Sequence, residues 1–104
     1  MSRSGDSAGP RQRLVISAAS QPALARHARL RFAETRKHWI LLAPERLLTP
    51  SETAVEVLQM CDGQRSVEAM AAALAAEYDA AAADILADIL PVLQELADKG
   101  YVTA

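Results

Sequence analysis

The chain has 104 residues, of which 23% are charged, and a formal net charge of −2. A chain of this length forms one domain with a modest core, which leaves little room for an enclosed active site. It has no signal-peptide pattern, no apolar run of about eighteen residues and a single cysteine, so the sequence predicts a soluble, cytoplasmic protein without a transmembrane helix, an internal disulfide or a cysteine-based metal cluster.

The charge is divided unevenly along the chain. Residues 1–50 contain nine Lys or Arg and three Asp or Glu, whereas residues 51–104 contain two and ten. The halves therefore carry +6 and −8, which sum to −2. Such an asymmetry is informative about partners rather than about the fold. An ordinary solvated surface on both halves is the alternative.

The first 25 residues are rich in Ser, Ala, Arg, Gly and Pro, with one short apolar run at Leu14, Val15 and Ile16. This composition predicts a flexible tail or linker. The folded domain then occupies residues 26–104.

Three short strands are predicted next. Residues 29–32 alternate polar and apolar side chains with a period of two, as in a half-buried strand, and residues 38–42 form an apolar-rich run of strand length. Residues 45–48 form a third strand with Pro44 at its entrance, where a missing N–H is tolerated.

A first helix is predicted to begin at Pro50. The run Thr49-Pro50-Ser51-Glu52 has the pattern of a capping box, with Thr49 as the cap and Pro50 in the first turn. An apolar stripe follows it, and the turn around Gly63 ends the helix by adopting a positive φ.

Two more helices follow. Ser66 is predicted to cap a helix that begins at Val67, and Asp79 to cap a third helix that closes at Gly100. Pro91 falls inside the third helix and is expected to kink or loosen it. The buried positions that the periodicity predicts are Val67, Met70, Ala71, Leu74, Ala75 and Tyr78 in the second helix, and Ile85, Leu86, Ile89, Leu90, Leu93, Leu96 and Ala97 in the third.

Three short antiparallel strands followed by three helices predict an α+β domain with a winged-helix-like arrangement. No catalytic site is predicted for it. His27 and His38 lack partners at metal or triad spacing, Cys61 lies on the apolar stripe of the first helix, and no phosphate loop or hydrolase motif is present. The sequence predicts no enzyme, no cofactor and no metal.

A winged-helix nucleic-acid-binding domain is the alternative function that this topology raises. A recognition helix normally carries basic residues, whereas residues 66–99 contain seven Asp or Glu and one Lys. We therefore favour a peptide that adds as a strand to the edge at residues 45–48, with apolar pockets from the third helix. A structural subunit that binds only an enzyme partner is a third possibility.

Several blocks of this sequence resemble the pyrroloquinoline quinone biosynthesis protein D (PqqD) family, over about residues 29–102. They are RLRF at residues 29–32, WILLAPER at 39–46, CDGQRSV at 61–67 and LADKGYV at 96–102, together with the T-A-x-E-V-L pattern at 53–58. The order and spacing of these blocks match the family.

The resemblance implies a recognition element for ribosomally synthesised, post-translationally modified peptides (RiPPs). Such proteins act as chaperones that bind the precursor peptide PqqA and present it to PqqE, a radical S-adenosylmethionine enzyme that cross-links a Glu to a Tyr. No nucleic acid and no membrane is an expected partner. The peptide adds beside the third strand against the third helix, which here points to Glu45, Arg46, Leu47, Leu48, Leu86, Ile89, Leu90 and Leu93.

Overall fold

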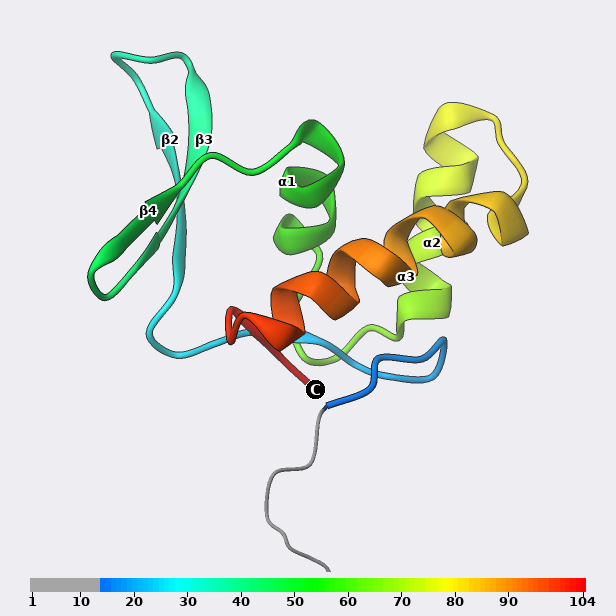
Figure 1. The fold of residues 1–104 in the computed structure, drawn as a ribbon. Coiled ribbons are helices and arrows are strands. Elements are labelled where there is room, and N and C mark those ends of the chain that lie inside the picture. The colour runs from blue at the N-terminus through cyan, green and yellow to red at the C-terminus, as the bar shows by residue number, and fades with distance from the viewer. Residues whose placement is uncertain (1–13) are drawn as a thin grey trace, which may run out of the picture.

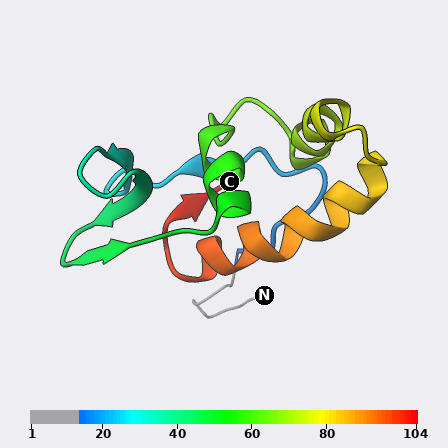
Figure 2. The same cartoon turned by 90° about the horizontal axis from the view of Figure 1, so that it is seen from above.

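The computed structural model describes residues 14–104, which form a small antiparallel sheet packed beside three helices (Figure 1). The sheet lies on one side of α1 and α2 on the other, while α3 runs from α2 past α1 toward the sheet (Figure 2). The predicted α+β class, with three antiparallel strands followed by three helices, is confirmed. The elements are β1 (Ala23–Leu24), β2 (Arg29–Ala33), β3 (His38–Ala43), β4 (Arg46–Leu48), α1 (Glu52–Gln59), α2 (Val67–Tyr78), α3 (Ala82–Asp98) and β5 (Val102–Thr103).

The three-stranded sheet has the order β2-β3-β4, so that β3 is central and β4 is an edge. Leu41 of β3 pairs with Leu30 of β2 on one side and with Leu48 of β4 on the other. Paired residues share a face of the sheet, and Leu41 is only 1% exposed. These leucines therefore define the core face of the sheet.

The third strand begins one residue later than predicted. β4 starts at Arg46, because Glu45 forms a two-residue turn with Pro44 and has a φ of 64°. Proline favours the first central position of such a turn, and the second central position takes the positive φ. Glu45 therefore belongs to the hairpin turn and not to the strand.

The first helix begins two residues later than predicted. Ser51, and not Thr49, is the N-cap, and its Oγ accepts a hydrogen bond from the Ala54 N–H at 3.2 Å. Pro50 lies before the cap, so that the capping-box pattern is offset from the true helix start. Four residues of α1 face the core, namely Ala54, Val55, Val57 and Leu58.

The second helix begins at Val67, as predicted. Its cap, Ser66, accepts a hydrogen bond from the Ala69 N–H at 3.0 Å. The predicted stripe is buried except at its end, where Tyr78 is 52% exposed. Asp79 was expected to cap α3, but it ends α2 instead in the left-handed conformation, with a φ of 53°.

The third helix starts at Ala82 without a side-chain cap and runs unbroken through Pro91. Pro91 lies on the exposed face, and Ala87, whose carbonyl loses its helical hydrogen bond, is exposed as well. Water can therefore take the place of the missing N–H. On the opposite face, Ile89, Leu93 and Leu96 reach into the core.

The segment before β2 is packed against the domain from residue 14 onward, although we predicted a tail or linker up to residue 25. Ile16 is buried, and the Val67 N–H donates to the Ser20 carbonyl at 2.9 Å. β1 pairs with β5, with Ala23 opposite Thr103. The packed region thus extends beyond the predicted boundary at residue 26, while residues 1–13 of the predicted tail lie outside the described residues.

Within residues 14–104, no helix has both the length and the apolar character needed to cross a membrane.

Candidate functional site

The free edge of β4 exposes backbone hydrogen-bonding groups. The two-residue turn makes Ala43 and Arg46 a hydrogen-bonded pair, and such pairs alternate along an antiparallel ladder. Arg46 and Leu48 thus bond to β3, whereas the N–H and C=O of Leu47 point away from it. Leu47 is 51% exposed, so this donor and this acceptor are open to an added strand.

A groove lies between β4 and the C-terminal half of α3. Its cavity has a volume of about 240 Å³. Leu41, Ala54, Leu96 and Tyr101 are the buried side chains of its wall, and Leu48 and Val92 are half-buried. We call this cavity the β4–α3 groove, and its complete lining is Leu41, Leu48, Thr49, Pro50, Ser51, Ala54, Val92, Glu95, Leu96, Lys99 and Tyr101.

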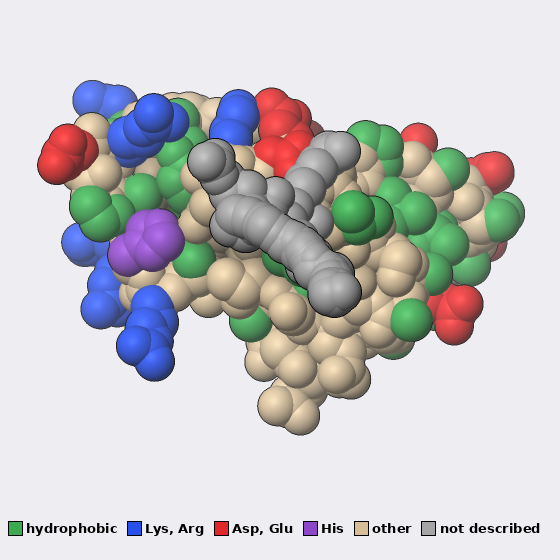
Figure 3. Space-filling view, turned by 60° about the horizontal axis from the view of Figure 1, so that its bottom comes forward, with side chains coloured by type: hydrophobic (Ala, Val, Ile, Leu, Met, Phe, Trp, Pro, Cys, Tyr) green, Lys and Arg blue, Asp and Glu red, His purple; other side chains and the backbone are tan. Residues whose placement is uncertain are grey.

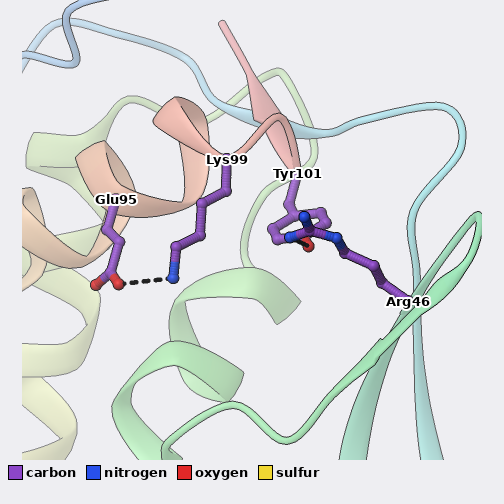
Figure 4. A network of polar contacts seen from close by, with 4 residues as sticks. All are labelled: Arg46, Glu95, Lys99 and Tyr101. Carbon is purple, nitrogen blue, oxygen red and sulfur yellow. Dashed lines mark hydrogen bonds and ion pairs between the residues drawn. The ribbon is translucent and has the colours of Figure 1, made fainter.

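A second cavity of about 270 Å³ shares Lys99 and Tyr101 with this groove. We call it the basic pocket. Arg46 reaches from β4 to Tyr101, where its Nη1 lies 3.4 Å from the hydroxyl oxygen, and Lys99 forms an ion pair with Glu95 at 2.9 Å (Figure 4). The basic pocket is lined by His27, Ala43, Pro44, Arg46, Lys99 and Tyr101.

The structure brings together only part of the predicted site. Leu48 lines the groove and Arg46 lines the basic pocket. The backbone N–H and C=O of Leu47 lie on the free edge of β4. Glu45 lies in the preceding turn, outside the strand.

The predicted α3 residues point elsewhere. Ile89 and Leu93 are 1% and 0% exposed in the core. Leu86 lines a separate hollow between α2 and α3, and Leu90 is partly buried against the core. None of the four lines the β4–α3 groove.

The α3 residues that line the groove lie on a neighbouring stripe. Val92, Leu96 and Lys99 follow one another at spacings of four and three residues, so they share a face of the helix. Sequence reasoning missed Val92, Glu95 and Lys99, because α3 is apolar on two adjacent faces. The i, i+3, i+7 spacing of Val92, Glu95 and Lys99 was the available signal.

An aromatic cleft lies on the other face of α1. The rings of Phe32 and Trp39 pack edge to face with centroids 5.6 Å apart, and Tyr78 closes the far side of a cavity of about 490 Å³. The Tyr78 hydroxyl donates to the Glu56 carboxylate, and this bond raises the pKa of Tyr78 to about 12. The sequence analysis did not predict this cleft.

Cys61 is buried, and its Sγ donates to the Val57 carbonyl at 3.2 Å. Burial, with a smaller contribution from the charge of Asp62, raises the pKa of the Cys61 thiol to about 12. The thiol is therefore protonated and unreactive at neutral pH. In the part of the chain that the structure describes, no group of three His, Cys, Asp or Glu side chains is arranged to hold a metal ion.

The charge asymmetry of the sequence becomes a spatial division in the fold. Lys and Arg side chains gather over the sheet end, and Asp and Glu side chains lie chiefly toward the helices (Figure 3). Arg46 and its basic pocket lie on the sheet side, and Glu95 marks the helix side of the groove. The groove therefore lies between the basic and acidic parts of the molecule.

Comparisons with known proteins agree with this architecture. Residues 38–102 match the family model described as "Coenzyme PQQ synthesis protein D (PqqD)". A protein of Rhodopseudomonas palustris (strain BisB5) named "PqqA binding protein" is 56% identical over 90 residues, which cover 86% of this chain and 88% of that protein. A protein of the same name from Bradyrhizobium diazoefficiens is 54% identical over 96 residues, covering 92% of each chain.

Two solved structures are similar as well. The solution structure of the PqqD truncation of Methylobacterium extorquens PqqCD, described as a functional and stand-alone RiPP recognition element, is 43% identical with a TM-score of 0.75 and covers 86% of this chain and 96% of that one. The crystal structure of PqqD from Xanthomonas campestris is 40% identical with a TM-score of 0.50, and the coverages are 82% and 94%. From its sequence blocks, its fold and these relatives, the chain belongs to the PqqD family.

Proposed function

We propose that this protein binds the precursor peptide PqqA, which adds as a strand to β4 and places side chains in the β4–α3 groove. The observation that carries the proposal is the open backbone of Leu47 beside an apolar cavity of about 240 Å³. Main-chain hydrogen bonds to an edge strand hold an extended peptide, and pockets for alternate side chains select its sequence. The names of the relatives, which describe binding and recognition and not catalysis, support the same role.

The binding surface of this proposal comprises Arg46, Leu47 and Leu48 on β4, Val92 and Leu96 on α3, and Lys99 at the C-cap of α3. Ile89 and Leu93, which we predicted as direct contacts, support this surface from the core, and Glu45 shapes the turn beside it. Leu86 and Leu90 have no direct part in it.

We further propose that the bound peptide is presented to the radical S-adenosylmethionine enzyme PqqE. A similar solved structure is the PqqD truncation of the longer protein PqqCD, which supports the view that a domain of this kind works beside a second protein unit. A peptide held along one edge by β4 leaves its other edge and its flanking residues accessible to that enzyme.

Titration calorimetry with PqqA, followed by PqqE as a third component, tests both parts. We expect saturable one-to-one binding of PqqA and entry of PqqE into the complex. Amide chemical shifts should move at residues 46–48 and 92–99 and stay in place at Arg29 and Arg31 on the outer face of the sheet. Heat of binding without these shift changes would mean that PqqA binds at another site. Absence of any heat of binding would rule out PqqA as the ligand.

A further inference from the structure

We infer that the basic pocket binds a carboxylate side chain of the peptide, two residues from the apolar side chain that fills the β4–α3 groove. The inference rests on the proposed strand addition. It adds a sequence requirement that the peptide must meet: an acidic residue and an apolar residue separated by one position.

The lining of the basic pocket is the first observation. Arg46, Lys99 and His27 place three nitrogen-bearing side chains around it, and no carboxylate is among its lining residues. Tyr101, which is 2% exposed, forms part of the wall. An anionic group therefore complements this pocket, and a cationic one does not.

The two cations of the pocket differ in how far they are neutralised. The Lys99 ammonium already pairs with Glu95 at 2.9 Å on the helix surface. Arg46 lies beside the neutral Tyr101 hydroxyl, at 3.4 Å (Figure 4). Within residues 14–104, no carboxylate lies within ion-pair distance of its guanidinium. A guanidinium presents paired donors that match a carboxylate in a bidentate geometry. Arg46 is thus the specificity-determining residue of the pocket.

The spacing follows from the register of β4. Arg46 and Leu48 pair with Ala43 and Leu41 and point to the same face of the sheet, because they are two residues apart. Leu48 lines the apolar groove, and Arg46 lines the basic pocket. An added strand advances by the same rise, about 3.3 Å per residue, so its residues opposite Arg46 and Leu48 are also two apart.

Strand direction decides the order of the two peptide residues. If the peptide runs antiparallel to β4, the apolar residue opposite Leu48 precedes the acidic residue opposite Arg46. The motif is then apolar-x-acidic, and for a parallel peptide it is acidic-x-apolar.

The test is a double-mutant cycle measured by calorimetry. Synthetic PqqA peptides, each with one Asp or Glu changed to Asn or Gln, are titrated into the wild-type chain and into the Arg46→Gln variant. One peptide substitution should weaken binding to the wild type by about tenfold, the size typical of a charge-assisted pair, and should have little further effect on Arg46→Gln. Lys99→Gln should show a smaller coupling with the same peptide residue.

Arg31→Gln is the matched control, because Arg31 is an exposed arginine of β2 that lies outside both cavities. It should show no coupling with any peptide residue. A second scan, of apolar peptide residues to Ala against Leu48→Ala, should find the partner of Leu48 two positions from the acidic residue. Circular dichroism and the unfolding midpoint of each variant confirm that the fold is retained.

The outcomes separate this inference from the proposed function. Binding of PqqA with no acidic residue coupled to Arg46 would overturn the carboxylate requirement and leave strand addition in place. Coupling to an acidic residue at another spacing would overturn the register. If wild-type protein fails to bind PqqA, the proposed function itself fails.

Discussion

The side chain of Gln94 binds the backbone of Ile16 across 78 residues of sequence. Its Oε1 accepts from the Ile16 N–H at 2.9 Å, and its Nε2 donates to the Leu14 carbonyl at 2.8 Å. One side chain of α3 thus satisfies two backbone groups of the N-terminal segment. Ile16, which is 7% exposed, is fixed in the core by this clamp.

Replacing Gln94 with Ala should lower the free energy of unfolding by about 2 kcal/mol, at about 1 kcal/mol for each of the two bonds to the N-terminal segment. The third bond of this side chain, to the Asp98 carboxylate at 2.9 Å, is exposed and should add little. Urea denaturation measures this change. Gln94→Glu keeps the acceptor for Ile16 but sets a carboxylate oxygen against the Leu14 carbonyl and the Asp98 carboxylate, so it should be less stable than the wild type as well. Equal stability of all three proteins would show that the hydrogen bonds of Gln94 to Leu14 and Ile16 contribute nothing to the free energy of unfolding.

Replacing Leu47 with Pro should weaken PqqA binding about fivefold, because it removes the one outward N–H of β4, worth about 1 kcal/mol. Proline is tolerated at an edge position whose N–H does not bond to the neighbouring strand. The ladder with β3 should therefore survive. Leu47→Ala, which keeps the N–H, separates the side-chain effect, and an equal loss for both variants would argue against backbone pairing at this residue.

Truncating Val92 to Ala should weaken PqqA binding about fivefold, since about 1 kcal/mol of apolar contact leaves the groove. The same truncation at Leu86, which lines the hollow beside α2, should leave binding unchanged. Calorimetry on the two variants shows whether the peptide binds in the β4–α3 groove or at the face of α3 that the periodicity predicted. Weaker binding by the Leu86 variant, with no change for the Val92 variant, would place the peptide at the predicted face instead.

Replacing Pro91 with Ala should stabilise the protein by about 2 kcal/mol, because the new N–H can bond to the carbonyl of Ala87 and the ring no longer crowds the preceding turn. Pro91 is exposed, so no core packing is lost. Thermal and urea unfolding give the change. A destabilised variant would mean that the helix depends on the geometry that proline imposes.

Asp62 should make stability depend on pH at the acidic end. Its carboxylate accepts the N–H groups of Gln64 and Arg65 at 2.9 and 3.0 Å, and these bonds hold the pKa of Asp62 below its usual 3.8. Asp62 therefore binds a proton more readily in the unfolded chain than in the folded one. The contribution of the Asp62 carboxylate to the free energy of unfolding is complete above pH 3.8, and it is lost as the pH falls through the lower pKa that Asp62 has in the folded state.

Urea unfolding at a series of pH values around and below 3.8 measures this loss. Asp62→Asn keeps an oxygen acceptor but does not titrate at that position, so its stability should fall less steeply with acid. Parallel curves for the two proteins would assign the acid dependence to other groups.

Elements with a local signal were predictable. The Ser66 cap and the apolar spacing that follows it predict α2 from its first residue, because capping and periodicity act within one turn of helix. Asp79 shows the limit of such signals. An aspartate serves as an N-cap or as a left-handed helix end, and here Asp79 takes the second role, with its N–H donating to the Ala75 carbonyl.

The groove was predictable only in part, for a physical reason. The edge strand follows from Pro44 and the residues after it, but the face of α3 that meets β4 depends on the angle at which the helix crosses the sheet. Ile89 and Val92 are both apolar, and spacing alone does not rank their faces. Two-residue strands such as β1 and β5 have no periodicity to predict them, and they form through pairing between segments far apart in the sequence.

Tyr101 links the groove to the N-terminal segment thermodynamically. Its side chain lines both cavities, its N–H donates to the Leu96 carbonyl, and its own carbonyl accepts the Ala25 N–H, each at 2.9 Å. A ligand that binds only the native arrangement of Tyr101 stabilises every bond formed in that arrangement, by mass action. The amide of Ala25, which donates to Tyr101 but lines neither cavity, should then exchange its hydrogen more slowly when the groove is filled. Its exchange rate is therefore an indirect measure of how much of the groove is occupied.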